Sequence, residues 1–204
     1  GRLTLGMVAA GAIAKKVLGN TVVKAELISV GGSKDFEKTI GRAVEERDSV
    51  GGIVECRVNG LPIGLGEPFF DSAESLLAHA LFSIPGIKGV EFGAGFACAG
   101  MKGSECNDAL IGKDGKTRTN NSGGASGGMT NGNEVVLRVA VKPASSIGKA
   151  QKTLNLASGK ETELKIGGRH DACIALRVPV ITEAAAAIVF ADLALLNRAC
   201  RIQN

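Results

Sequence analysis

The sequence predicts an α+β fold with a largely antiparallel sheet and flanking helices. Segments with helical spacing and segments rich in β-branched residues follow one another without the strict strand–helix–strand rhythm of a doubly wound parallel sheet. Tight-turn signals also join some extended segments directly, which is typical of antiparallel pairs. The 204 residues contain no repeat and no clear boundary. We therefore expect residues 1–204 to form a single domain.

The expected elements follow in order along the chain. Residues 3–18 are apolar and rich in Ala and end at Lys15, Lys16 and Gly19, which predicts a helix with its usual C-terminal residues. A β-rich run follows over 22–32, and apolar residues with helical spacing predict an amphipathic helix over 35–48. The remaining expected elements are a strand that ends at the Asn59-Gly60 turn, a helix over 71–83, strands over 87–96 and 134–143, a hairpin that turns at Ser158-Gly159, and a closing helix over 180–200.

Composition limits the classes of partner. The net charge of +4 suits a small anionic molecule but is too weak to indicate nucleic acid. Only 3% of the residues are aromatic, and Trp and Tyr are absent, so few side chains could stack on bases. We therefore expect a small-molecule ligand and no nucleic-acid partner.

The cysteines and the apolar stretches predict a cytoplasmic protein without a metal site. The five cysteines include no CxxC pair, and neither of the two histidines lies near a cysteine pair, so we expect reduced thiols and no zinc. The most apolar stretch, over 171–196, is interrupted by Arg177, Glu183 and Asp192. No uninterrupted run reaches the roughly 20 residues of a membrane span, and we expect no membrane partner.

The stretch "TNNSGGASGGMTNG", residues 119–132, is the most unusual part of the sequence. Glycine costs more ordering entropy than any other residue, so a chain keeps it where the backbone needs positive φ or a close approach. The N–H groups of such a loop could contact a planar or anionic ligand. A disordered loop would explain the stretch equally well, because it contains no P-loop or dinucleotide-binding pattern.

A second polar cluster, "KPASSIGK", follows the strand expected over 134–143. Lys142 supplies a cation, Pro143 fixes the chain direction, and Ser145 and Ser146 supply hydroxyl donors, which together could hold a phosphate. The alternative is a strand end with a solvated lysine and a serine turn.

A third cluster, "GGRHDAC", places Arg169, His170 and Asp171 in succession. If the segment is extended, Arg169 and Asp171 point one way and His170 the other. The first two could then hold an anion and handle a proton. A surface ion pair beside a solvated histidine is the alternative.

Taken together, these stretches resemble one family. The segments "GRLTLGMVAAGAIAKKVL", "GLGEPFFDSAESLLAHALFSIPGIKGVEFGAGF", "MKGSECND", "TNNSGGASGGMTNG", "VKPASSIGKAQKT" and "GRHDACIALRVPVITEAAAAIVFADL" are similar, in order, to blocks of chorismate synthase. The resemblance runs nearly end to end and covers the C-terminal three-fifths, roughly, of a typical member. It implies a β-α-β sandwich with largely antiparallel sheets.

The resemblance also implies a function. The family eliminates phosphate from 5-enolpyruvylshikimate 3-phosphate to give chorismate, in the shikimate pathway of aromatic amino acid biosynthesis. The reaction depends on reduced FMN without net redox change, and some members reduce the flavin themselves with NADPH. The resemblance implies a carbon–oxygen lyase that forms a homotetramer.

Motif by motif, the resemblance implies which residues bind the flavin and which one takes part in catalysis. Asp171 corresponds to a carboxylate near the flavin that handles protons, so it is the expected catalytic residue. The positions expected to contact FMN are Pro85, Gly86, Gly127, Lys142, Pro143, Ala144, Ser145, Ser146 and Arg169. We expect Gly127, the run from Lys142 to Ser146, and Arg169 to meet in one pocket.

The sequence also departs from the family. Two catalytic histidines and an Arg-Ser-Ser segment of the family lie upstream of Gly1, so we expect these 204 residues alone to be inactive. Leu3 replaces a carboxylate, Cys106 stands where His or Asn is usual, and Ala172 replaces a proline beside Asp171. Two other hypotheses remain open, a non-catalytic α+β module that binds an anionic metabolite and a scaffold for assembly.

Overall fold

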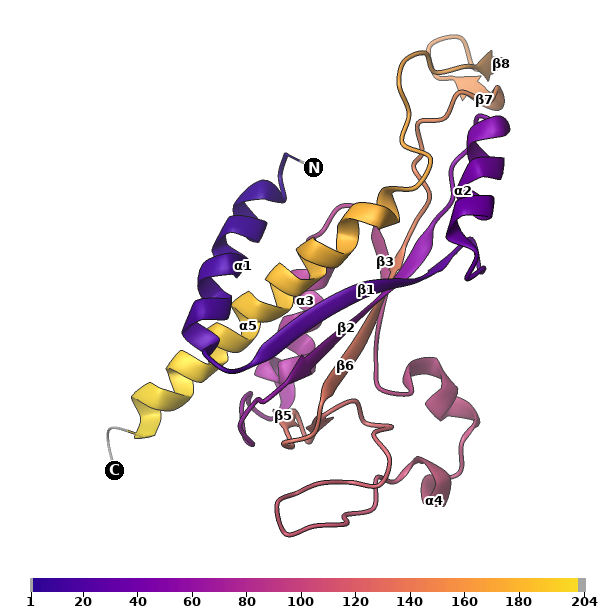
Figure 1. Ribbon diagram of the computed structural model, residues 1–204. Helices are drawn as coiled ribbons and strands as arrows, with labels where there is room; N and C mark the ends of the chain where they lie inside the picture. Colours follow the sequence, from indigo (N-terminus) through magenta and orange to yellow (C-terminus); the bar gives the residue numbers. More distant parts are fainter. Residues whose placement is uncertain (1, 202–204) are drawn as a thin grey trace.

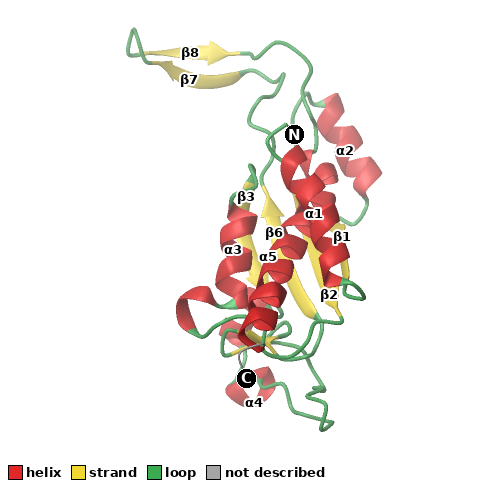
Figure 2. Cartoon of the chain, turned by 90° about the vertical axis from the view of Figure 1, so that its left-hand side faces the viewer, coloured by secondary structure: helices red, strands yellow, loops and turns green. Residues whose placement is uncertain are grey.

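The computed structural model describes residues 2–201. Its centre is a four-stranded sheet in the order β1-β2-β6-β3, in which every neighbouring pair is antiparallel. Helices α1, α3 and α5 cover one face of this sheet (Figures 1 and 2). The strands are β1 (Val22–Val30), β2 (Gly52–Asn59), β3 (Ile87–Phe92) and β6 (Val135–Val141), and the helices of the layer are α1 (Leu5–Leu18), α3 (Ala73–Phe82) and α5 (Val178–Arg201).

The core lies between the sheet and this helical layer. Period-two alternation directs three facing pairs of the central strands β2 and β6 toward the helices: Val54 opposite Val139, Cys56 opposite Leu137, and Val58 opposite Val135. All six side chains are buried, and Phe190 of α5 is fully buried against them in the same core. The regular alternation fixes the register, since a one-residue slip would turn these side chains to the other face.

Helix α5 packs closely against α1. A Cβ atom placed on Gly11 of α1 would lie 2.4 Å from Cβ of Ala184 in α5, so only glycine permits this approach. Helix α5, with the short η3 turn (Ile174–Arg177) before it, is also long and apolar enough to cross a membrane. Since 61% of its most apolar 18-residue stretch is buried inside the fold, it is explained as a core helix.

Side-chain caps explain where two helices begin. Asp35 accepts a hydrogen bond from the backbone N–H of Lys38 and starts α2 (Phe36–Glu45). Ser72 does the same for the N–H of Ser75 and starts α3.

The opposite face of the sheet carries charged residues joined by ion pairs. Glu55 of β2 is only 7% exposed and accepts from Arg57 and from Arg138 of β6, at 2.8 Å in each case. Arg138 also donates to Glu91 of β3 at 3.0 Å. Because these residues are cross-strand neighbours, the network ties three strands together on the side away from the helices.

A hairpin projects from the end of the sheet at which β6 finishes (Figures 1 and 2). It consists of β7 (Gln151–Asn155) and β8 (Lys160–Leu164), whose residues are all exposed. Asn155 accepts hydrogen bonds from the N–H groups of Ala157 and Ser158, and Gly159 adopts φ +65°. The hairpin and its turn agree with the sequence prediction.

The segment between β3 and β6, which includes the glycine-rich stretch 119–132, lies at the opposite end of the sheet and is folded by its own polar side chains (Figure 1). It contains η2 (Gly95–Gly100), α4 (Gly103–Cys106) and the two-residue strands β4 (Ala125–Ser126) and β5 (Met129–Thr130). Asp108 accepts hydrogen bonds from Thr119, from the N–H of Asn121 and from Ser122. The alternative of a disordered loop is therefore wrong.

The predicted fold class, an α+β fold with an antiparallel sheet and flanking helices, is confirmed. The described residues supply one sheet and one helical layer of the expected sandwich. That residues 1–204 form a single domain stays a prediction.

Candidate functional site

Three of the predicted segments meet at the end of the sheet where β6 finishes and β3 begins. They are the segment with Pro85 and Gly86, the run from Lys142 to Ser146, and the segment with Arg169 and Asp171. The carbonyl oxygen of Gly86 accepts a hydrogen bond from the N–H of Lys142 at 2.9 Å. Gly86 has φ +99°, and a Cβ atom there would lie 3.1 Å from the side chain of Ile174. The positive φ therefore favours glycine, and the end of the Ile174 side chain leaves little room for a larger residue. Pro85 directly precedes it in the same connection between α3 and β3.

Residues just before β2 form hydrogen bonds with both the run from Lys142 to Ser146 and the segment that contains Asp171. The hydroxyl of Ser49 donates to the carbonyl oxygen of Ala144 at 2.7 Å. The N–H of the next residue, Val50, donates to the carbonyl oxygen of Ala172 at 2.8 Å. Ser49 and Val50, which directly precede β2, therefore hold the run after β6 next to the segment before α5. The sequence analysis did not identify Ser49, because its role depends on this tertiary contact.

The run after β6 presents polar groups to solvent. Lys142, Pro143, Ser145 and Ser146 are exposed, and the Lys142 ammonium donates to the hydroxyl of Ser145 at 2.8 Å. Ile147 is buried directly after the run and anchors it. One cation and two hydroxyls thus stand on a fixed backbone, as the phosphate-binding interpretation requires.

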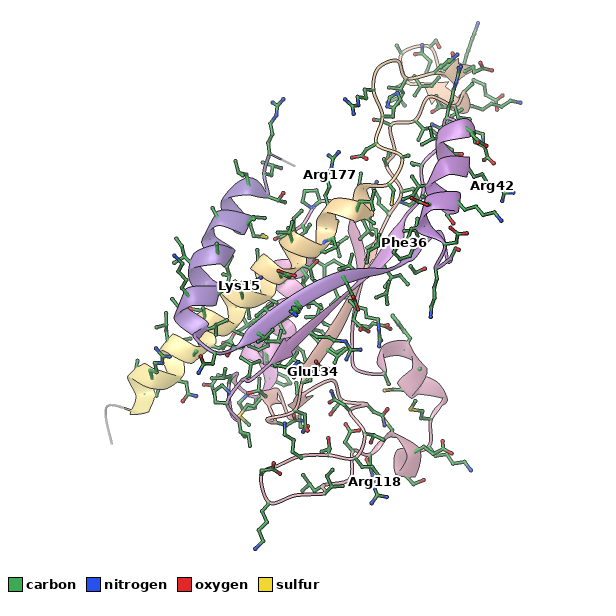
Figure 3. All side chains as sticks on the ribbon, viewed as in Figure 1. Lys15, Phe36, Arg42, Arg118, Glu134 and Arg177 are labelled. Carbon is green, nitrogen blue, oxygen red and sulfur yellow. The ribbon has the colours of Figure 1, made fainter. Side chains whose placement is uncertain are left out.

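The segment with Arg169 and Asp171 is irregular and not a strand. Arg169 is exposed, and the ion-pair partner of Asp171 is Arg177, at 3.1 Å. The surface ion pair between Arg169 and Asp171, considered as an alternative, is therefore wrong. The short η3 turn brings Arg177 back to Asp171, and Figure 3 shows Arg177 at the start of α5, at the end of the sheet where the hairpin leaves it.

A cavity of about 480 Å³ lies directly beside these segments. His170 lines it, whereas Arg169 and Asp171 are not among its lining residues. The imidazole Nε2 of His170 lies 2.9 Å from the carbonyl oxygen of Ile166. The cavity is lined by Val44, Arg47, Asp48, Gly148, Lys165, Ile166, Gly167, Gly168, His170 and Ala172.

Gly127 lies elsewhere. It sits in the turn between β4 and β5, and its neighbour Gly128 accepts a hydrogen bond from the N–H of Ala73, at the start of α3. Gly86 follows the far end of α3, and Lys142 follows the far end of β6. The length of these two elements therefore separates Gly127 from the other segments. The prediction that all of them meet in one pocket is wrong within one chain.

Gly127 is the first residue of the two-residue turn between β4 and β5. It adopts φ +62°, and a Cβ atom there would meet no atom within 4 Å, so its backbone is open to solvent. The neighbouring glycines are different, because a Cβ atom on Gly128 would lie 2.6 Å from the carbonyl oxygen of Glu67. Close contacts within this chain therefore explain why residue 128 is glycine. Apart from its chain neighbours, no atom of the described residues lies within 4 Å of the position that a Cβ atom on Gly127 would take.

The fold defines an α+β protein, and this end of its sheet gathers the exposed side chains of Lys142, Ser145 and Ser146 beside the segment that contains Asp171. A sequence model described as chorismate synthase matches residues 1–195. The chain belongs to the chorismate synthase family.

The relatives extend the comparison. The chain is 62% identical over 199 residues to a chorismate synthase of Chitinophaga pinensis, covering 97% of this chain and 60% of the relative. It is 42% identical over 226 aligned positions to a chorismate synthase of Dehalococcoides mccartyi, covering 96% and 62%. A crystal structure of chorismate synthase superposes with a TM-score of 0.79 at 26% identity, covering 95% of this chain and 63% of that one. The chain thus spans about three-fifths of the length of these relatives.

Proposed function

We propose that the intact protein containing this chain is a chorismate synthase, a carbon–oxygen lyase that eliminates phosphate from 5-enolpyruvylshikimate 3-phosphate. The observation that carries the proposal is the meeting of the Gly86, Lys142–Ser146 and Asp171 segments in a chain that belongs to this family. These are the segments that the family resemblance assigns to the cofactor and to proton handling.

The residues present fit an anionic planar cofactor such as reduced FMN. Lys142, Ser145 and Ser146 offer charge and hydroxyl donors to a phosphate or to a polar ring edge. The neighbouring side chains are small and leave the backbone accessible, so that a planar ring can lie against it. They belong to Pro85, Gly86, Pro143 and Ala144. When bound, the flavin supplies electron density to the substrate as the phosphate leaves.

The remaining residues act on the substrate and its protons. Exposed Arg169 is available to pair with an anion, because the part of the chain that the structure describes gives it no ion-pair partner. Asp171, held by Arg177, is the carboxylate that accepts or returns a proton beside the flavin. NADPH is a further candidate reductant, and the protein is proposed to work in the cytoplasm.

The position of Gly127 supports a site shared between copies of the chain. We infer that the protein is a homotetramer in which the open backbone of Gly127 from one copy reaches the flavin held by Lys142 of another. The test is subunit complementation of two variants, Gly127→Val and Lys142→Ala, assayed at a flavin concentration too low for either variant to be active alone. Mixed oligomers contain some sites with both native residues, so co-expression restores activity, whereas two differently tagged Lys142→Ala copies give none. Mixed oligomers without activity would disprove the shared site.

The assay for the proposed function is phosphate release with chemically reduced FMN and the enolpyruvyl substrate, without oxygen. We expect the intact protein to turn over and residues 1–204 alone to release no phosphate, while both bind flavin measurably. A non-catalytic module for an anionic metabolite would bind the substrate without releasing phosphate in either form. Absence of flavin binding by the intact protein would refute the proposal.

A further inference from the structure

Two thiols face each other beside the glycine-rich segment. Cys98 lies in η2 and Cys106 at the end of α4, and the Cys106 thiol contacts Sγ of Cys98 at 3.7 Å. Both side chains are half-buried. A disulfide needs a sulfur–sulfur distance of about 2.05 Å, so the two atoms must approach by roughly 1.7 Å to form one. We propose that Cys98 and Cys106 form a reversible disulfide when the protein meets hydrogen peroxide.

The other three cysteines lack this arrangement. Cys56 and Cys173 are buried, and burial raises the pKa of the Cys56 thiol to about 12, so both are protected from oxidants. Cys200 is exposed on α5. In residues 2–201 the pair is the one place where two thiols contact each other.

The contact also assigns the two roles. The thiol of Cys106 donates its weak hydrogen bond to the sulfur of Cys98, and that bond, with burial, raises the pKa of Cys106. Cys98 is therefore the sulfur that reacts with peroxide, and Cys106 is the thiol that resolves the product.

The step balances with peroxide as the oxidant. The Cys98 thiolate attacks one peroxide oxygen, the O–O bond breaks, and a sulfenic acid and hydroxide form. The hydroxide takes a proton from solvent and becomes water. The sulfur of Cys106 then attacks the sulfur of Cys98, the S–O bond breaks, and the Cys106 proton leaves with the oxygen as a second water. The two thiols lose two electrons, which peroxide gains, and a dithiol reductant reverses the step.

The disulfide would restrain residues that form hydrogen bonds with the glycine-rich loop. The side-chain amide of Asn121 donates to the carbonyl oxygens of Glu105 and Cys106, at 3.2 and 3.1 Å. On the other side, the N–H of Phe96 donates to Glu91 at the end of β3, at 3.3 Å. A bond between Cys98 and Cys106 therefore connects the end of the sheet to the residues that hold the loop over 119–124. We expect the oxidised protein to open this loop less often.

The test uses the intact protein, treated with hydrogen peroxide, alkylated and analysed by peptide mass spectrometry. We expect a Cys98–Cys106 linked peptide that dithiothreitol reverses and that forms about tenfold faster than any dimer through Cys200, because the two thiols are already in contact. Cys98→Ser and Cys106→Ser abolish the link, and the matched control Cys200→Ser retains it. Cys106→Ser should accumulate a sulfenic acid on Cys98.

A second readout follows amide hydrogen exchange over residues 105–124, which should slow severalfold on oxidation and recover on reduction. Exchange in Cys200→Ser should respond in the same way. The proposal is overturned if peroxide links either cysteine to another residue, or if it oxidises Cys200 while Cys98 and Cys106 remain free thiols.

Discussion

Arg177 Nη1 lies 3.1 Å from Oδ2 of Asp171, so the carboxylate proposed for proton handling is held by a cation of its own chain. We expect Arg177→Gln to lower kcat about tenfold with a small change in flavin affinity, because a misdirected catalytic group loses rate more than binding. The measurement is anaerobic phosphate release at saturating reduced FMN.

A double-mutant cycle separates this positioning role from a general loss of charge. If Arg177 acts through Asp171, Arg177→Gln has no further effect in an Asp171→Asn background. Arg177→Lys should recover part of the rate, because it keeps the charge but loses the guanidinium geometry. Additive effects of the two substitutions would contradict the assignment.

Lys142 and Arg169 are expected to bind anionic groups of the flavin or substrate. Loss of a charge-assisted hydrogen bond costs about 1.5–3 kcal/mol, which weakens affinity by roughly 10- to 150-fold. Titration of Lys142→Ala and Arg169→Ala with each ligand measures this loss. Lys16→Ala, an exposed cation on α1, is the control and should bind as the native protein does. Unchanged affinities would mean that both cations are only solvated.

Gly11 and Gly6 provide a matched pair on α1. A Cβ atom on Gly11 would lie 2.5 Å from Cα of Ala184, whereas one on Gly6 would meet nothing within 4 Å. Gly11→Ala should therefore destabilise the protein by about 1–3 kcal/mol, because α1 must move away from α5. Gly6→Ala should stabilise it by about 0.5–1 kcal/mol through helix propensity. Urea denaturation measures both, and similar effects of the two substitutions would refute the packing argument.

Most of the helices and strands could be predicted from local signals in the sequence. The lysines and Gly19 at the end of α1, and Gly159 in the hairpin, act within a few residues of themselves, and the elements they predict are present. Contacts across the chain were less predictable. The pairing of Asp171 with Arg177 depends on a 3₁₀ turn, and the separation of Gly127 from Lys142 depends on the direction of β6. Family motifs give residue identities, but only tertiary structure decides which of them meet in one copy.

Asp108 holds the glycine loop through hydrogen bonds to both carboxylate oxygens. Thr119 Oγ1 and the N–H of Asn121 donate to Oδ1, and the N–H and hydroxyl of Ser122 donate to Oδ2. Burial raises the pKa of Asp108, but these hydrogen bonds outweigh it and lower the value to about 2. In Asp108→Asn, whichever way the amide is turned, one pair of donors faces an NH₂ group. We expect the loop to lose about 1–3 kcal/mol of local stability.

The pH dependence follows from the same shift. Because the folded pKa of about 2 lies below the ordinary value of 3.8, the stabilisation is complete above the ordinary value and is lost as the pH falls toward 2. Native and Asp108→Asn proteins should thus differ most above about pH 4 and converge toward pH 2.

The loop can open without the sheet, so amide hydrogen exchange at residues 119–124 is the appropriate measurement, with global unfolding as a secondary one. Exchange there should be about 5- to 150-fold faster in Asp108→Asn near neutral pH, which corresponds to the expected loss of local stability. Asp114→Asn is the control, because Asp114 accepts a single 3.3 Å hydrogen bond from the N–H of Lys116. Equal exchange in the native and Asp108→Asn proteins at neutral pH would show that the glycine loop is held by its own backbone turns and not by this carboxylate.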